Sequence, residues 1–429
     1  MTAILALQRL FDVGQLLRSV LPVKGVSAMR KPARPISKTI LLLAILVLAA
    51  FGPGAKADDS VTKGAALAPK VPGKTRIAHV FLGEVTAIAG RKGWLQEEFG
   101  KYNAKADLVN VASYGAAGTR AALFDRGDLH FGSGMMQGSL LMPAQGLDTV
   151  MIWMSAPVPP RRATVAVRID SDINSVADLK GKTLGSSVVG CPYYAAIESL
   201  RAQGAEVDND LKRGDIRYLN ISGASATSAF LAGRFDATAW HPATSTSAAL
   251  YVQNQVREVS TALPKGVYTE GGGRSAITAM RKWVDANPDL VKAFLTAWDR
   301  TVRWLNSDHG AHLDEAATIV ARELRISKSL ALYDLKDEAR ISLDWGETDF
   351  AETVKALKKF YQYQVENRDP FFTKNRLTDK QIEAIPDRRF LAGGEYFVDT
   401  SEKRKHAATS EPPAGAPART QFALVKGSR

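Results

Sequence analysis

The sequence predicts an α/β fold in which short buried strands alternate with amphipathic helices. At 429 residues, 45% of them hydrophobic, the chain is long enough for two ordinary globular domains. The alternation runs over residues 75–168 and returns over residues 183–261, whereas residues 287–365 carry only helical patterns. Strands joined by helices form parallel sheets, which bind ligands at the carboxyl ends of the strands. We therefore look for a site at those ends.

The elements follow one another in a regular order. The first half has expected strands at 75–81, 107–111, 129–132, 150–154 and 164–168, and expected helices at 85–101, 119–125 and 135–141. The second half has expected strands at 183–188, 216–220, 235–240 and 256–261, and expected helices at 192–203 and 225–232. A strand at 275–280 returns the chain to the first half, and expected helices follow at 290–305, 313–324, 328–334 and 350–365.

The stretch from Val167 to Tyr194 is the centre of the pattern. It forms a strand, a turn, a second strand and then a helix opened by Gly190-Cys191-Pro192, where proline suits the first helical position. A glycine before a helix start leaves unpaired N–H groups directed at one point. Such a point favours a sulfonate, a carboxylate or a phosphate.

The net charge of +12 lies mostly at the two ends of the chain. Residues 1–57 hold eight Lys or Arg and one Asp, and residues 402–429 hold six basic and two acidic residues, which leaves +1 for the body. A nearly neutral body gives no electrostatic basis for binding nucleic acid. We expect no nucleic-acid partner.

Residues 30–57 have the three parts of a secretory signal. Basic residues precede the apolar run 40–51, and Ala55-Lys56-Ala57 precedes Asp58, so we expect cleavage near Ala57 and Asp58 and export to the periplasm. Residues 1–28 have two explanations. Either translation starts at Met29, which we favour, so that these residues are absent from the protein, or they extend the basic n-region of the signal. We expect a linker at 58–74 and a disordered basic tail at 402–429.

Several chemistries lack the residues they need. Cys191 is the single cysteine, so the chain has no intramolecular disulfide and no cysteine-rich metal site. We find no metal-ligand spacing, nucleophile elbow or phosphate-binding loop. We expect no cofactor, no metal and no catalytic residue.

Five segments together resemble the type II periplasmic substrate-binding proteins of ABC transporters, in their nitrate, sulfonate and taurine group. SDINSVADLKGKTLG (171–185) is similar to that group's S-x-I-x-S-x-x-D-L-K-G-K-x-x-G run. The others are RKGWLQEEFGKY (91–102), RGDLHFGSG (126–134), AGRFDATAWHP (232–242) and ANPDLVKAFLTAWDRTVRWLNSD (286–308). The chain departs from the pattern at His130 and His241.

The resemblance implies a fold of two lobes, each a mainly parallel sheet flanked by helices, with a ligand cleft between them. Lobe I would comprise residues 75–167 and 271–401, and lobe II residues 168–270, with crossings near Arg168 and 263–268. It also implies a monomer that captures a small ligand and delivers it to an ABC permease in the inner membrane. The ligand class expected from the resemblance is a small anionic or sulfonate-like molecule.

The expected ligand-binding residues lie where strands end and helices begin. They are Ser113, Tyr114, Gly115, Ser133, Gly134, Gly190, Cys191, Tyr193, Trp240 and His241. Hydroxyls and helix-start N–H groups suit an anion, and aromatic faces suit an organic body. Turn formation explains several of these residues equally well. Because arginines are sparse near these positions, we expect backbone N–H groups and hydroxyls, rather than a guanidinium, to hold the anion.

Three alternatives stay open. A binding subunit of a TRAP-type transporter shares the DLKGK run and the two-lobe fold. An enzyme of the thiamine-pyrimidine type is similar in fold but carries a cysteine-rich motif that this chain lacks. Separately from that family, a Cys191 thiolate near His241 is conceivable as a catalytic nucleophile. The third alternative is a sensory periplasmic protein without a transporter.

Overall fold

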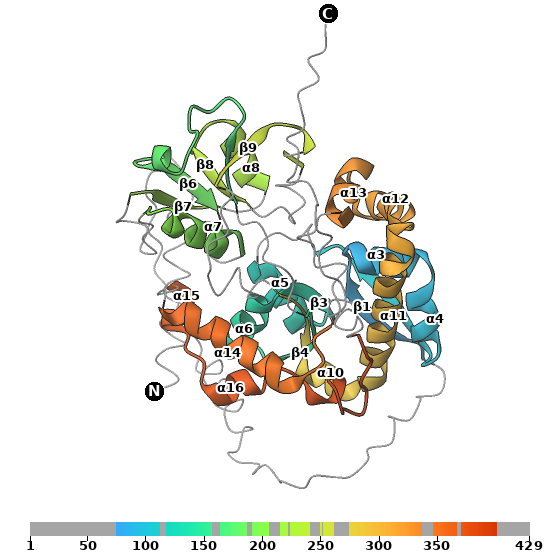
Figure 1. Ribbon diagram of the computed structural model, residues 1–429. Coiled ribbons are helices and arrows are strands. Elements are labelled where there is room, and N and C mark those ends of the chain that lie inside the picture. Colours follow the sequence, from blue (N-terminus) through green and yellow to red (C-terminus); the bar gives the residue numbers. More distant parts are fainter. Residues whose placement is uncertain are drawn as a thin grey trace, which may run out of the picture. The chain divides into compact units, whose positions relative to one another are not determined.

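The computed structural model describes eleven segments of the chain (Figure 1). They are 74–111, 117–156, 164–186, 191–205, 215–221, 224–240, 249–250, 252–260, 274–336, 346–366 and 370–400. The expected export segment and basic tail lie outside them. Within the described segments, no helix is long and apolar enough to cross a membrane.

The first sheet combines strands from both ends of the described chain. Its spatial order is β2 (Ala104–Val109), β1 (Arg76–Phe81), β3 (Gly132–Met135), β10 (Ser275–Met280) and β4 (Thr149–Met154). β1 pairs with β2 in parallel, and a parallel bridge from Val80 to Phe131 joins β1 to β3. β10 runs antiparallel to both β3 and β4. One returning strand therefore lies between strands that all run the other way.

The second sheet repeats this plan. Its order is β7 (Arg217–Asn220), β6 (Thr183–Ser186), β8 (Ala237–Trp240), β5 (Thr164–Arg168) and β9 (Val256–Ser260). β6 is parallel to β7 and β8, whereas β5 is antiparallel to β8 and β9. Since β5 pairs within the second sheet, this pairing favours placing the first lobe boundary before Thr164.

Helices flank both sheets. The α-helices are α3 (Glu84–Arg91), α4 (Trp94–Gly100), α5 (Ala117–Arg126), α6 (Met136–Ala144), α7 (Cys191–Ala202), α8 (Ala224–Leu231), α10 (Arg281–Ala286), α11 (Pro288–Asn306), α12 (Leu313–Leu324), α13 (Lys328–Lys336), α14 (Phe350–Glu366), α15 (Pro370–Lys374) and α16 (Asp379–Glu383). Short 3-10 helices lie at η2 (Ala177–Leu179), η4 (Ser307–Gly310) and η5 (Arg388–Phe390).

Most of these elements match the sequence prediction, with three differences. The single helix expected over 85–101 is two helices, because Gly93 adopts a left-handed conformation with φ of 77°. Gly132 and Gly134 lie inside β3 rather than in a turn after it. α10, α15 and α16 were not expected, since each spans only five or six residues and such short segments show little periodicity.

An aromatic cluster forms the core beside the first sheet. Phe131 stacks on Phe294 with ring centroids 4.4 Å apart, and Trp298 lies 5.3 Å from Trp153. These four rings are buried and come from β4, α11 and the residue before β3. The cluster therefore fixes α11 against this sheet.

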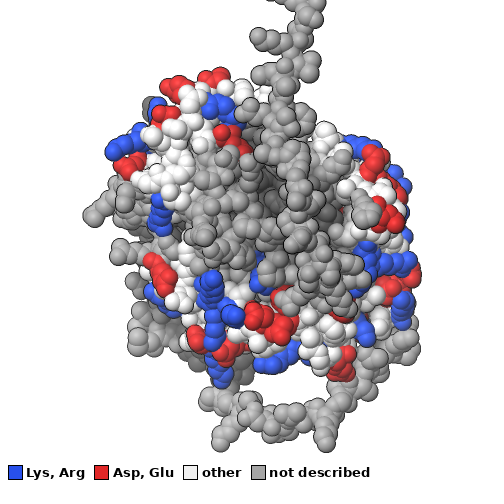
Figure 2. Space-filling model, viewed as in Figure 1, with Lys and Arg blue, Asp and Glu red and all other residues white. Residues whose placement is uncertain are grey.

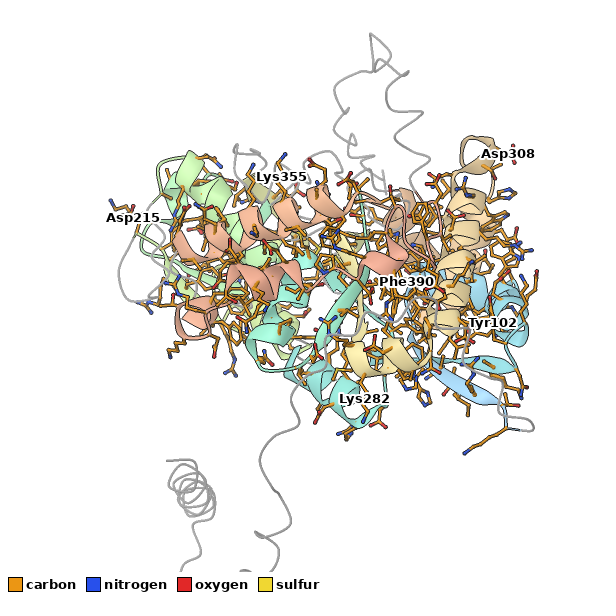
Figure 3. The ribbon with its side chains drawn as sticks, turned by 90° about the horizontal axis from the view of Figure 1, so that it is seen from below. Tyr102, Asp215, Lys282, Asp308, Lys355 and Phe390 are labelled. Carbon is orange, nitrogen blue, oxygen red and sulfur yellow. The ribbon has the colours of Figure 1, made fainter. Side chains whose placement is uncertain are left out.

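The last described segment covers the outer edge of β4. The Met151 N–H donates to the Ile385 carbonyl at 2.7 Å, and the Asp387 N–H donates to the Met151 carbonyl at 2.9 Å. Within this segment the side chain of Phe390 is buried, whereas the side chain of Lys355 on α14 is exposed to solvent (Figure 3). An uncovered strand edge would offer unpaired backbone groups to another chain, and this segment satisfies them.

Candidate functional site

Two glycines of β3 allow α5 to approach the sheet closely (Figure 1). A Cβ on Gly132 would lie 2.6 Å from the Phe124 ring, and a Cβ on Gly134 would lie 3.0 Å from the Arg120 guanidinium. Phe124 and Arg120 are four residues apart and so share one face of α5. The helix thereby places a guanidinium beside Ser133 and Gly134, toward the carboxyl end of β3.

The Arg120 guanidinium is held there by a main-chain oxygen. Its Nη1 donates to the Ser133 carbonyl at 2.6 Å. Within the described segments, no carboxylate forms an ion pair with Arg120, and its burial lowers the pKa of this guanidinium from its usual value. A cation whose folded pKa is lowered reduces stability at every pH below that pKa. Arg120 therefore carries a cost to folding at neutral pH.

A second arginine near the same strand end is neutralised. Arg274 immediately precedes β10, and its carbonyl accepts a hydrogen bond from the Met136 N–H at 2.8 Å. Its guanidinium lies 3.6 Å from the Glu347 carboxylate, which is fully buried. The Asp349 N–H donates to Glu347 at 3.1 Å. This pair contributes no net charge.

A serine links β4 to β10 beside that ion pair. The Ser275 N–H donates to Ser155 Oγ at 3.0 Å, and the Ser155 N–H donates to the Ser275 carbonyl at 2.8 Å. Ser155 also forms an antiparallel bridge with Gly346. The strand ends of this sheet are thus lined by polar groups that are fixed in position.

The structure describes half of the sequence-predicted site residues. Ser133 and Gly134 lie in β3 and share the contact with Arg120. Cys191 is the first residue of α7, with Tyr193 two residues later, and Trp240 is the last residue of β8. Ser113, Tyr114, Gly115, Gly190 and His241 lie outside the described residues.

Arg120 was missed by the sequence prediction, which expected no guanidinium at the strand ends. The structure places one beside Ser133 and Gly134. Its signal was present in the sequence, because Arg120 and Phe124 recur at helical spacing just before the F-G-S-G run. Only the packing of α5 on β3 shows that the two segments meet.

A histidine cluster lies at the opposite end of the sheet. His130 Nδ1 accepts the His79 N–H at 2.9 Å, and the His130 ring stacks on Trp283 at 4.6 Å. Burial, and next the charge of His79, lower the pKa of His130 to about 4. His79 in turn approaches Asp107 at 3.2 Å. Among the described residues, no group of three or more His, Cys, Asp or Glu side chains is arranged to hold a metal ion.

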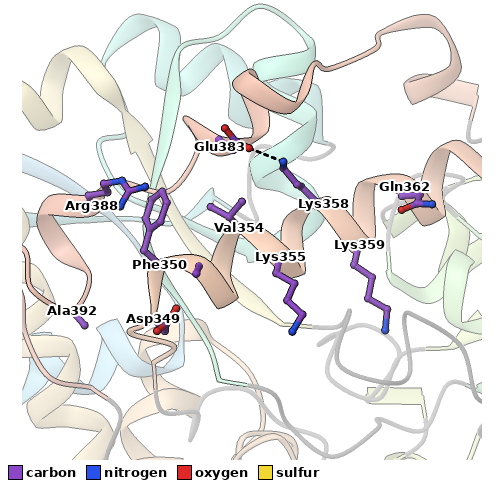
Figure 4. Close-up of a pocket in the computed structure, with 11 residues that line it drawn as sticks. Asp349, Phe350, Val354, Lys355, Lys358, Lys359, Gln362, Glu383, Arg388 and Ala392 are labelled. Atoms are coloured by element: carbon purple, nitrogen blue, oxygen red, sulfur yellow. Dashed lines mark hydrogen bonds and ion pairs between the residues drawn. The ribbon is translucent and has the colours of Figure 1, made fainter.

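A surface hollow of about 980 Å³ lies along α14 and the segment that follows it (Figure 4). Lys355 and Lys359 point outward from α14 there, Lys358 binds Asp379 and Glu383, and Arg388 lies 3.4 Å from the Phe350 ring centre. Acidic and basic side chains are interspersed over the face in Figure 2. This hollow is formed by helix surfaces rather than by strand ends.

The sequence profile of the NMT1/THI5-like family matches residues 91–309, just over half of the chain. The chain belongs to this family. No curated protein sequence matches the chain significantly. The family match and the strand order agree with the resemblance found in the sequence.

Solved structures share the fold. The alkanesulfonate-binding protein SsuA from Xanthomonas axonopodis pv. citri, bound to MOPS, is 21% identical, covers 71% of this chain and 95% of its own, and has a TM-score of 0.55. The periplasmic aliphatic sulphonate binding protein SsuA from Escherichia coli is 18% identical, with 74% and 91% covered and a TM-score of 0.54. These likenesses confirm the predicted two-lobe α/β fold of periplasmic binding proteins.

An enzyme also shares this fold. A mutant of the desulfurization enzyme DSZB in complex with biphenyl-2-sulfinic acid is 16% identical, covers 75% of this chain and 97% of its own, and has a TM-score of 0.50. The fold alone therefore does not separate binding from catalysis.

Proposed function

We propose that this protein is an exported solute-binding protein that closes on a small organic anion and delivers it to an ABC importer in the inner membrane. The observation that carries the proposal is the connection between the two sheets. The chain passes from β4 of the first sheet to β5 of the second, and returns from β9 to β10. Two crossings of this kind permit hinge closure around a ligand.

The proposed ligand is a sulfonate-like molecule. The SsuA proteins that share the fold are described as binding alkanesulfonates or aliphatic sulphonates. The strand ends of the first sheet offer fixed polar groups, and Cys191, Tyr193 and Trp240 of the second sheet remain proposed contacts. A ligand drives closure only if it binds the closed state better. It must therefore touch both lobes.

The first test is thermal unfolding of the purified protein against a panel of candidate ligands. The panel contains taurine, alkanesulfonates, aromatic sulfonates, MOPS, nitrate, dicarboxylates and pyrimidines, in a sulfonate-free buffer. A ligand present at about 100 times its dissociation constant stabilises the folded state by roughly 2.7 kcal/mol. This gives an upward shift of the melting temperature by several degrees. A shift with sulfonates supports the proposal, and silence across the panel contradicts it.

The enzyme alternative has a separate test, because Cys191 begins α7, where a helix start favours a thiolate. We expect Cys191→Ser to bind the identified ligand with unchanged stoichiometry, and neither form to consume it. Turnover of the ligand by the wild-type protein, lost in Cys191→Ser, would contradict the binding-protein proposal.

The TRAP alternative is tested by uptake of the labelled ligand in cells that lack the ABC ATPase. We expect that uptake to stop.

A further inference from the structure

We infer that Arg120 binds the charged head group of the ligand and that this head group carries a single negative charge. The inference rests on the proposed solute-binding function and specifies its ligand. It concerns a residue that neither the family match nor the sequence pattern singles out.

Most N–H groups of the Arg120 guanidinium have no hydrogen-bond acceptor among the described residues. A guanidinium presents several N–H groups in a fixed fork that matches the oxygens of a carboxylate or sulfonate. The described contacts of Arg120 comprise one hydrogen bond, from Nη1 to the Ser133 carbonyl. That bond orients the fork at the carboxyl end of β3. The remaining N–H groups are the donors that an oxyanion requires.

Several partly buried or buried arginines of this chain have carboxylate partners, whereas Arg257, like Arg120, donates to a main-chain carbonyl, that of Ser171. Arg76 pairs with Asp289, Arg389 pairs with Asp285 and Asp387, and Arg274 pairs with Glu347. Arg120 differs from them, because no described carboxylate pairs with it. Leaving a desolvated cation unpaired is strongly unfavourable. An anionic ligand would remove that penalty on binding.

Glycine at position 134 keeps the space beside the guanidinium open. A Cβ there would come within 3.0 Å of Arg120 Nη1, which is tighter than an ordinary contact. The glycine therefore has a steric role in placing the guanidinium, in addition to being part of β3. This role explains why small residues and an arginine occur together at this strand end.

Among the described residues, the charge balance at this end favours a ligand with one negative charge. Arg274 is neutralised by Glu347, so the described groups here leave the single positive charge of Arg120. A sulfonate or monocarboxylate would neutralise it. A doubly charged anion would instead leave one negative charge desolvated and unpaired. The site should therefore prefer ethanesulfonate to inorganic sulfate.

A purely structural role for Arg120 and a role in ligand binding predict different effects of its replacement on the melting temperature of the ligand-free protein. If the bond to Ser133 served to hold α5 on β3, removing it would lower the melting temperature. If Arg120 is kept charged for a ligand, replacing it by an apolar side chain of similar length removes a partly buried charge that has no carboxylate partner among the described residues. The ligand-free protein would then melt at the same temperature or higher.

The first experiment compares ligand-free Arg120→Met and Arg126→Met with the wild type by thermal unfolding. Arg126 lies on the same helix, is exposed and, among the described residues, pairs with the exposed Asp128, so it is a matched control. We expect Arg126→Met to melt close to the wild type and Arg120→Met at the wild-type temperature or above. A melting temperature of Arg120→Met clearly below that of Arg126→Met would overturn the inference.

The second experiment measures calorimetric binding of ethanesulfonate and of sulfate at matched ionic strength. We expect the wild type to bind ethanesulfonate more tightly than sulfate, and Arg120→Met to bind ethanesulfonate at least about tenfold more weakly, the effect typical of a charged hydrogen bond. Equal affinity in Arg120→Met, or tighter binding of sulfate, would overturn the inference while leaving the solute-binding function standing. Failure of the wild type to bind any anion, together with silence in the ligand panel, would overturn both.

Discussion

At the scale of single residues, His130 is held neutral by its surroundings. Its Nδ1 accepts the His79 N–H, so the ring proton lies on Nε2, and burial lowers its pKa to about 4. The titratable groups that face it are His79 and, beyond it, Asp107. The unfolded chain takes up this proton near the ordinary pKa of 6.5. Stability is therefore complete above about pH 6.5 and falls as the pH drops toward 4.

We predict that His130→Asn reduces this loss of stability in acid. Asparagine can keep an acceptor for the His79 N–H but takes up no proton. Each pKa unit corresponds to about 1.4 kcal/mol, so the difference between the two proteins amounts to at most about 3 kcal/mol, less screening by solvent. Urea unfolding from pH 7 to pH 4 measures it. An equal loss of unfolding free energy in both proteins would count against the assigned pKa.

At the residue scale, the sequence placed Trp240 at a strand end, and Trp240 is the last residue of β8. It placed Ser133 and Gly134 just after a strand, whereas both lie inside β3. The role of Gly134 depends on Arg120, which is fourteen residues earlier and meets it only through helix packing. A contact between two elements produces no periodic pattern in the sequence of either element. The guanidinium was missed for that reason.

At the scale of elements, the contact between α5 and β3 depends on the absence of a side chain at Gly132. Two ring atoms of Phe124 would lie 2.6 Å and 2.9 Å from a Cβ there. Phe124 is itself buried, so its ring has little room to move. Any side chain at position 132 would therefore push α5 away from the sheet.

We predict that Gly132→Ala destabilises the protein by about 1–3 kcal/mol, the range found when a packed core is overfilled. Gly138→Ala is the matched control, because Gly138 lies in α6 and nothing surrounds its Cβ position within 4 Å. We expect that control to stabilise the protein by about 0.5–1 kcal/mol. Chemical denaturation compares the two. A neutral Gly132→Ala would show that α5 does not pack as described.

Strand direction is the element-level feature that the sequence did not predict. The alternation of strands and helices predicts parallel neighbours, and β1, β2, β6, β7 and β8 follow it. β5 and β10 instead run antiparallel to their neighbours. The hydrophobic pattern identifies a buried strand, but it does not give the direction in which that strand runs relative to its neighbours.

At the scale of the whole molecule, the two sheets share one plan. Each has four strands in one direction and one returning strand, which is β10 in the first sheet and β5 in the second. The repetition of the strand and helix pattern was enough to predict two similar halves. The segment that covers β4 could not be predicted, because residues 384–400 make their contacts through irregular backbone. Irregular backbone has no period to detect.

The central claim is that the two lobes close on an anion through Arg120. Small-angle X-ray scattering of the wild type and of Arg120→Met, each with and without the sulfonate identified in the panel, tests it most directly. We predict that the ligand makes the wild type more compact and leaves Arg120→Met unchanged at the same concentration. Ligand binding that leaves the wild-type radius of gyration unchanged, or equal compaction of both proteins, would contradict the claim.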